Sequence, residues 1–178
     1  MNEYVNKLVV TSKKPKKIAK MLCKQIRLML SPNVTLNLKD SNPSIKRYKS
    51  IADEFKMSHF IVTGNNFIKI GKYPEGPTIL FEVIDYNPEL EPTDKRIFAS
   101  DPLITCSGED SDLYSLFTSL SQPPKIPQRN INFHFEDDKI VVRHYKILTE
   151  EDDNIKVGLE NIGPNFSLRI KKIEDTFF

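Results

Sequence analysis

The sequence contains no tryptophan, only two cysteines and only six glycines, and it has no long apolar run. Cys23 and Cys106 stand far apart without a second pair, which excludes a disulfide framework or a zinc site and favours a reducing compartment. The uncharged apolar runs are about 4–6 residues long, whereas a membrane helix needs about 20, so no membrane span is predicted. Residues 1–10 lack the apolar stretch of a secretory signal.

Motifs for catalysis and metal binding are also missing. His59, His134 and His144 have no metal-ligand spacing, so we expect them to be structural or surface residues. There is no nucleophile elbow and no phosphate-loop lysine motif, and nothing places either cysteine near a histidine. The run Glu150–Asp153 favours a solvated acidic loop over a magnesium site, because adjacent acids seldom converge on one ion. We therefore predict no enzyme activity, no metal and no cofactor.

The composition supports a folded core and hides a charge asymmetry. With 178 residues, 39% of them hydrophobic, the chain can form one domain or two small halves that share a core. Residues 1–50 contain 12 lysines and arginines against two acids, a balance of +10, whereas residues 51–178 contain 14 against 22, a balance of −8. Such asymmetry suggests that the basic part binds a polyanion. The alternative is that the basic and acidic parts of the surface neutralise each other's charge across the fold.

The basic part reads as a strand over 4–10 followed by a helix over 16–30. The helix is predicted by apolar residues at spacings of four, four and three, which form one face. These core-facing residues are Ile18, Leu22, Ile26 and Met29. Thr11 and Ser12 suit a helix start and Pro32 a helix end.

On the opposite face of this helix and in the residues before it, every charged side chain is basic. A row of cations displaces condensed counterions from nucleic acid and so provides affinity without sequence reading. The candidate RNA contacts are Lys13, Lys14, Lys16, Lys17, Lys20, Lys24 and Arg27, with Lys46, Arg47 and Lys49 continuing them. Tyr48 within the second cluster could stack a base. The alternatives are a lysine-rich solvent face or a membrane-surface helix, the latter weakened by the absence of tryptophan or phenylalanine anchors.

The acidic remainder reads as hairpins and loops. One short helix is predicted over 112–120, with Asp112 as a possible cap, and Pro123, Pro124 and Pro127 form the clearest internal linker. Strands are predicted over 58–63, 67–70, 79–84, 102–105, 131–135, 140–147 and 166–173. The last strand alternates and has a mostly basic outer face. Further RNA candidates are Arg143, Arg169, Lys171 and Lys172, and the alternative for them is cross-strand pairing with nearby acids.

Four stretches in order carry a family resemblance: residues 58–62, 72–81, 142–147 and 161–170. A fifth, residues 30–38, follows the first helix. Together they resemble a Brix domain and, within that superfamily, most resemble the Peter Pan/Ssf branch. The motif residues are Pro74, Gly76, Pro77 and Thr78, then Arg143, His144 and Tyr145, then Ile162, Gly163 and Pro164. The resemblance extends from about Tyr4 to Phe178.

The chain also departs from the family pattern. Residues 53–59 replace the usual Gly-Pro-Leu-Gly-Val-Thr-His, and Asn165 stands where an arginine is usual. Residues 87–100 are too short and too acidic for the basic helix that normally follows the first half, and the long charged tail is missing. The resemblance therefore implies a compact, tail-less member.

The resemblance implies a mixed α/β Brix domain whose two anticodon-binding-like halves, about 1–100 and 101–178, share a core. It implies an rRNA-binding assembly factor for the large ribosomal subunit precursor in the nucleolus, acting around the second internal transcribed spacer. The implied partners are precursor rRNA, ribosomal proteins and other assembly factors, including a helical partner protein. The alternatives are another Brix branch, such as that of the small-subunit processome, or a detached anticodon-binding-type module that binds transfer RNA. We expect the acidic stretches 87–100 and 149–154 to face solvent or basic proteins.

Overall fold

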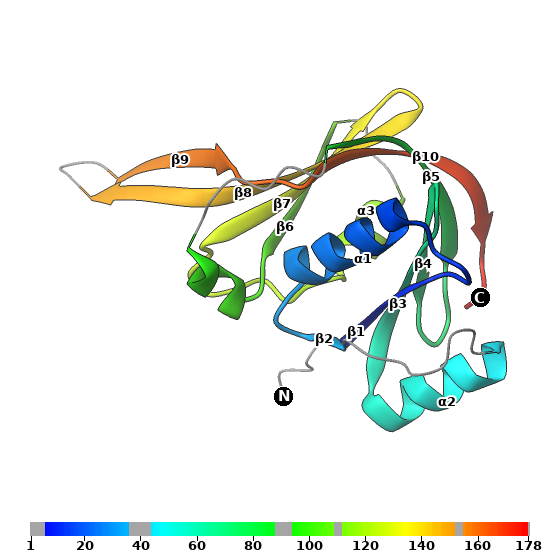
Figure 1. Ribbon diagram of the computed structural model, residues 1–178. Coiled ribbons are helices and arrows are strands. Elements are labelled where there is room, and N and C mark those ends of the chain that lie inside the picture. The colour runs from blue at the N-terminus through cyan, green and yellow to red at the C-terminus, as the bar shows by residue number, and fades with distance from the viewer. Residues whose placement is uncertain (1–5, 36–43, 88–93, 109–111, 152–154, 178) are drawn as a thin grey trace.

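The computed structural model describes residues 6–35, 44–87, 94–108, 112–151 and 155–177. Some expectations fall on residues 4–5, 36–38, 88–93 and 152–154, which lie outside this part of the chain. The described elements mix strands with a few helices, which confirms the α/β class (Figure 1). The strands are β1 (Asn6–Thr11), β2 (Val34–Thr35), β3 (Met57–Thr63), β4 (Phe67–Lys72), β5 (Thr78–Asn87), β6 (Leu103–Gly108), β7 (Arg129–Glu136), β8 (Lys139–Glu151), β9 (Ile155–Asn161) and β10 (Asn165–Glu174). The helices are α1 (Lys17–Met29), α2 (Ile45–Phe55), the 3-10 helix η1 (Lys95–Ala99) and α3 (Tyr114–Thr118).

One sheet runs through the molecule in the order β2-β1-β3-β4-β5-β10-β8-β7-β6, and β9 pairs with the far part of β8. Its two ends repeat one topology. β1 leads through α1 to a parallel β3, followed by antiparallel β4 and β5. β6 leads through α3 to a parallel β7, followed by antiparallel β8 and then β10. Antiparallel pairing of β5 with β10 joins the halves. The boundary near residue 100 stays a prediction.

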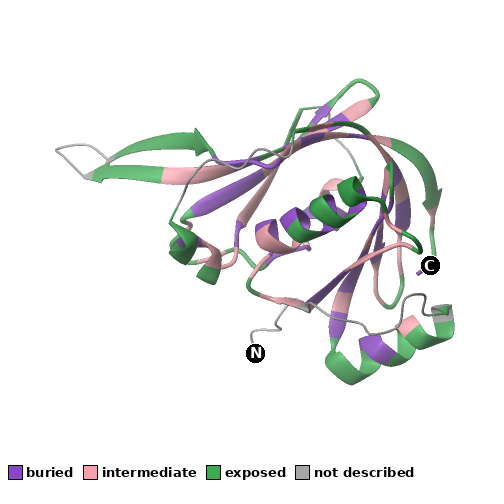
Figure 2. Cartoon of the chain, in the orientation of Figure 1, coloured by how far each residue is buried: buried purple, intermediate pink, exposed green. Residues whose placement is uncertain are grey.

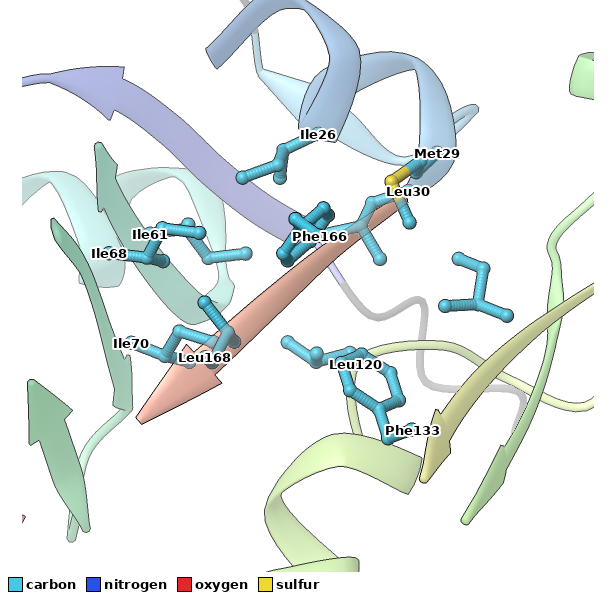
Figure 3. A pocket seen from close by; sticks show the side chains of 11 residues that line it. Ile26, Met29, Leu30, Ile61, Ile68, Ile70, Leu120, Phe133, Phe166 and Leu168 are labelled. Atoms are coloured by element: carbon cyan, nitrogen blue, oxygen red, sulfur yellow. The ribbon is translucent and has the colours of Figure 1, made fainter. Parts of the chain in front are cut away.

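The larger of two hydrophobic clusters lies on one face of the sheet, beneath α1 and α3. Strand side chains alternate between the two faces, so Val9 and Ile61 point into this core while Leu8 and Phe60 point to the other side. Phe117 of α3 stacks on a phenylalanine of β7. Residues from both halves also line a small apolar cavity of about 30 Å³ under α1 (Figure 3). Because its volume is only about 30 Å³, the cavity is a packing void and not a ligand site.

In the part of the chain that the structure describes, a helix covers the opposite face of the sheet in the first half but not in the second. In the first half, Ile51 and Ala52 of α2 pack on Leu8 and Phe60. In the second half α3 ends at Thr118 and β7 begins at Arg129, and the described loop between them forms no helix. The prolines expected to form an internal linker lie in this loop, within the second half. No described helix therefore covers the outer sheet face of the second half.

Several sequence-based expectations need correction. Ile18 is 46% exposed, because Ala19 and Cys23 occupy the inner side of α1 together with the other apolar residues. Asp112 does not cap α3, whose first turn starts one residue later, at Leu113, without a side-chain bond. Glu150 belongs to strand β8 and not to a loop. Helix α2 and strand β9 were not expected at all.

Candidate nucleic-acid interface

The outer side of α1 and the turn before it form a row of cations, here called the lysine face. Its members are all exposed: Lys13, Lys14, Lys16, Lys17, Lys20 and Lys24. Figure 2 shows the outward side of α1 exposed and its inward side buried. Among the described residues, no acidic side chain forms an ion pair with any of these lysines. Unpaired cations on a rigid helix are suited to phosphate oxygens.

The start of α1 is fixed by the neighbouring hairpin and not by a capping side chain of its own. The backbone N–H of Lys16 donates to Asn65 Oδ1, in the turn between β3 and β4, at 2.8 Å. This bond satisfies one of the free amides of the first turn. The lysine face is thereby held in a constant position relative to the sheet.

Arg27 differs from the lysines, although it was expected among them. It is half-buried, and its Nε and Nη2 donate to the carbonyl oxygen of Val9 at 2.9 and 2.7 Å. The guanidinium group is thus hydrogen-bonded to the backbone of β1. This geometry makes Arg27 a tie between α1 and the sheet and does not support a phosphate contact.

The second basic cluster lies on α2, on the other side of the sheet. Lys46, Arg47 and Lys49 are exposed. Tyr48 is half-buried and packs edge-on against Phe60, with ring centroids 5.3 Å apart. Its ring is therefore engaged in the core and is not free to stack a base. Since α1 and α2 pack on opposite faces of β1, the two clusters do not form one track on one face.

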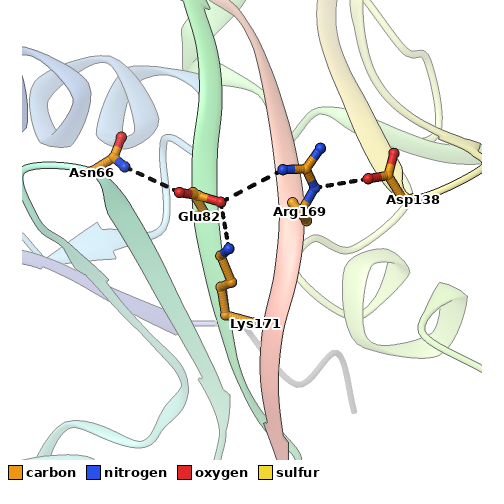
Figure 4. Close-up of polar contacts among 5 residues, drawn as sticks. All are labelled: Asn66, Glu82, Asp138, Arg169 and Lys171. Atoms are coloured by element: carbon orange, nitrogen blue, oxygen red, sulfur yellow. Dashed lines mark hydrogen bonds and ion pairs between the residues drawn. The ribbon is translucent and has the colours of Figure 1, made fainter.

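The basic residues of β10 are mostly paired with acids. Figure 4 shows Glu82 between Lys171 and Arg169, with Arg169 reaching on to Asp138. The hydrogen bond from Lys171 lowers the pKa of Glu82. Lys172 pairs along its own strand with a glutamate. Arg169 and Lys171 therefore form the cross-strand ion pairs that were the alternative to RNA contact.

Arg143 remains a candidate for RNA contact. It is exposed on β8, and no described acid pairs with it. It lies opposite Asn132 on the open sheet face. Nearby, Thr105 Oγ1 accepts hydrogen bonds from Asn130 and Asn132 at 3.0 Å each.

The motif residues that carry the family resemblance serve the fold. Gly76 has φ +97°, and a Cβ there would lie 2.7 Å from the carbonyl oxygen of Asp175, so only glycine fits this turn. His144 is buried, with Nδ1 2.9 Å from the carbonyl oxygen of Gly163 and Nε2 3.4 Å from Arg129. Burial, reinforced by Arg129, lowers the pKa of His144 to about 3. The second and third motifs therefore meet each other inside the molecule.

Arg129 is a central residue that sequence reasoning missed. Its side chain is fully buried and donates to the carbonyl oxygens of Met29, Ser31, Ile97 and Ser100. It thus ties the end of α1 to the segment that leads into the second half. A lone arginine after a proline-rich loop gives no signal of this role in the sequence.

Lys7 and His59 form a second buried polar pair near the junction of the halves. Lys7 is fully buried, and its Nζ has no hydrogen-bond partner among the described residues. Burial lowers the pKa of Lys7 to about 8, against the attraction of Asp101. His59 bonds through Nε2 to Ser119 at 3.0 Å, and burial followed by the charge of Lys7 lowers its pKa to about 3.

A hollow of about 570 Å³ lies on the uncovered face of the second half, here called the open groove. It is lined by residues of β6, β7, β8 and β9 and by the loop before β7. Three apolar side chains at its margin are largely exposed: Ile126 at 81%, Val157 at 65% and Leu159 at 58%. Apolar exposure of this kind marks an interaction surface.

The described residues were also compared with the requirements for metal binding, thiol chemistry and membrane insertion. In the described ranges, no cluster of histidine, cysteine, aspartate or glutamate is arranged to hold a metal ion. Cys23 and Cys106 are free thiols, and burial raises the pKa of each. None of the helices in the described residues is long and apolar enough to cross a membrane.

Comparison with known protein families gives a match over most of the chain. No curated protein sequence matches the chain. The Brix domain family matches residues 12–172, which span both halves, the lysine face and all three motifs. Brix domains are associated with RNA-binding factors of ribosome biogenesis. The chain belongs to the Brix domain family.

Proposed function

We propose that this protein is a nucleolar, rRNA-binding assembly factor for the large ribosomal subunit precursor, of the Peter Pan/Ssf branch, acting in processing around the second internal transcribed spacer. Membership of the Brix family supports the general role in ribosome assembly. The three sequence motifs support the branch. The protein acts by binding and not by catalysis.

The lysine face is the observation that carries the RNA-binding part of this proposal. Its six exposed lysines have no described acidic partner, and the helix that bears them is held by Asn65. Phosphate contacts position a protein on RNA without reading sequence. Specificity then comes from RNA shape and from neighbouring proteins.

The open groove is the surface we assign to the helical partner protein. On the equivalent face of the first half, α2 covers Leu8 and Phe60 with Ile51 and Ala52. The topology of the second half repeats that of the first, but none of its described helices covers this face. An amphipathic helix from a partner would supply the cover that α2 supplies in the first half. Ribosomal proteins with basic surfaces would meet the acidic side chains, such as Glu150, which is exposed on β8.

A salt titration of RNA binding tests the proposal. The variant Lys17→Glu, Lys20→Glu, Lys24→Glu should fold normally, because all three side chains are exposed. It should bind a precursor fragment much more weakly, and the slope of log affinity against log salt should fall by roughly 0.7–0.9 per lost contact. The matched control reverses the same number of charges on α2: Lys46→Glu, Arg47→Glu, Lys49→Glu. Equal affinity and slope for the lysine-face variant and the wild type would contradict the RNA-binding role.

Crosslinking in cells tests the finer assignment. Reads concentrated around the second internal transcribed spacer would support the large-subunit role. Reads on the small-subunit precursor would indicate another Brix branch, and reads on transfer RNA would indicate an anticodon-binding module.

A further inference from the structure

We propose that a pocket beside the lysine face binds a single unpaired RNA base, with a preference for guanine. The proposal rests on the RNA-binding function proposed above and adds a base-reading site to it. The pocket lies where α1, the β3–β4 turn and the end of β5 meet. Its volume is about 200 Å³, and its walls are Ile18 and Leu22 of α1, residues 64–66 of the turn and residues 83–86 of β5.

The lining of the pocket combines polar and apolar side chains, and two of its apolar side chains are partly exposed. Ile18 is 46% exposed and Ile84 is 42% exposed. These side chains are not buried in the core, so they remain available to a flat apolar ligand. Planar bases of single-stranded RNA are bound in this way, between apolar or aromatic side chains.

The pocket is rigid in the free protein. The hydroxyl of Tyr86 donates to Gln25 of α1, which joins the end of β5 to the helix. Asn65 holds the start of α1 through Lys16, and the backbone N–H of Val83 donates to the carbonyl oxygen of Asn66 at 3.0 Å. All three walls are thus bonded to one another, so a ligand would enter a formed site and lose little affinity to ordering.

The charge of the surroundings selects a polyanion as the ligand. Lys17 directly precedes Ile18 on the helix, and Lys13 and Lys14 precede the helix; all are exposed. A base in the pocket would therefore place its own phosphates against the lysine face. A peptide segment with an apolar side chain could fill the same walls, but it would leave these cations without partners.

One carboxylate gives the pocket its selectivity. Asp85 is exposed at the lining, and no described cation pairs with it. A free carboxylate repels RNA phosphates unless a donor satisfies it. Guanine offers two adjacent N–H donors to the two carboxylate oxygens, and beside them an oxygen that can accept from an amide such as that of Asn65. Uracil offers a single N–H donor, so Asp85 should discriminate between the two bases.

The test compares a short single-stranded oligouridine with the same oligomer carrying one central guanosine. The full-length wild type should bind the guanosine oligomer about tenfold more tightly. Asp85→Ala should abolish this ratio while leaving the salt slope unchanged. The ratio is the measurement that matters, because loss of a negative charge raises the affinity for every RNA. Glu150→Ala removes another exposed carboxylate, on β8, and should keep the ratio.

Two further results separate the pocket from the lysine face. Ile18→Asp should also abolish the ratio, and thioguanosine at the central position should crosslink to residues 18–22 or 83–86. The lysine-face variant should lose affinity and salt slope but retain the guanosine preference. A wild type without preference, or a preference that survives Asp85→Ala and Ile18→Asp, would overturn the pocket and leave the lysine face standing. Absence of salt-dependent binding to any RNA would overturn both.

Discussion

Arg27 donates two hydrogen bonds to a single backbone oxygen, that of Val9, and so joins the end of α1 to strand β1. This contact separates Arg27 from the lysines that share its helix. We expect Arg27→Ala to lower the free energy of unfolding by about 1–3 kcal/mol, because charge-assisted hydrogen bonds to a partly buried carbonyl are lost. Urea unfolding measures the change.

Lys24→Ala is the matched control, since Lys24 lies one turn earlier on α1 and is exposed. It should leave the unfolding free energy within about 0.5 kcal/mol of the wild type. If Arg27→Ala were as stable as the wild type and instead bound RNA less tightly, Arg27 would belong to the lysine face after all.

Lys7 is a buried cation whose replacement should stabilise the protein. Its Nζ is fully enclosed without a hydrogen-bond partner among the described residues, and burial lowers its pKa to about 8. Lys7→Met keeps a chain of similar length and removes the cost of burying the charge. We expect a gain of about 1–3 kcal/mol in unfolding free energy at pH 7.

The pH dependence of this gain identifies its cause. Between pH 8 and about 10.4 the unfolded chain holds the lysine proton more tightly than the folded protein does, so the wild type gains stability as pH rises. The difference between Lys7→Met and the wild type should therefore shrink over this range in chemical denaturation. A destabilised Lys7→Met at pH 7 would show that the ammonium group has a required partner.

Regular patterns in the sequence predicted most of the fold. The helix over 16–30 and the two hairpins follow from periodicity, and β7 and β8 lie within a few residues of their expected bounds. Helix α2 was missed because, among its described side chains, Ile51 and Ala52 alone are buried, and most of the others are charged. Strand β9 was missed because its described side chains are exposed on both faces, so no alternation marks it.

The candidate site was predictable in composition but not in detail. The lysines of α1 were recognised because a helix with one apolar face must expose the other. The orientation of Ile18 and the tie made by Arg27 depend on how far α1 is rotated against β1, which periodicity does not specify. The ion pairs of Arg169 and Lys171 with Glu82 depend on the strand register. The hydrogen bonds of Arg129 depend on contacts between segments that are far apart in the sequence.

The open groove predicts a second, protein-binding defect that is independent of RNA. Leu159→Asp places a charge at a position that is 58% exposed, so the unfolding free energy should change by less than about 0.5 kcal/mol. Quantitative affinity purification should show loss of the helical assembly partner while precursor rRNA is retained. Lys156→Asp, an exposed change on the same strand but outside the groove lining, is the control. Retention of every protein partner by Leu159→Asp would contradict the assignment of the groove.

Two buried histidines predict loss of stability in mild acid. Burial lowers the pKa of both His59 and His144 to about 3, well below the value of about 6.5 for an unfolded histidine. Between pH 6.5 and 3 the unfolded chain therefore binds more protons than the folded protein, and stability falls as pH falls. Each histidine contributes at most about 1.4 kcal/mol per pH unit in this window. Urea unfolding at pH 7.5, 6 and 5 should show a progressive decrease, and above pH 6.5 this contribution is constant.

Single substitutions assign the effect to its residues. His59→Gln removes the titration and keeps an amide that can bond Ser119, so the variant should be somewhat less stable than the wild type at pH 7.5 but should lose less stability between pH 6.5 and 5. His134→Gln is the control, because His134 is exposed on the open sheet face. It should reproduce the acid profile of the wild type. If His59 resists protonation in the folded protein, its removal must reduce the dependence of stability on pH. An unchanged profile for His59→Gln would therefore mean that protons bound by other groups, such as carboxylates, cause the acid sensitivity.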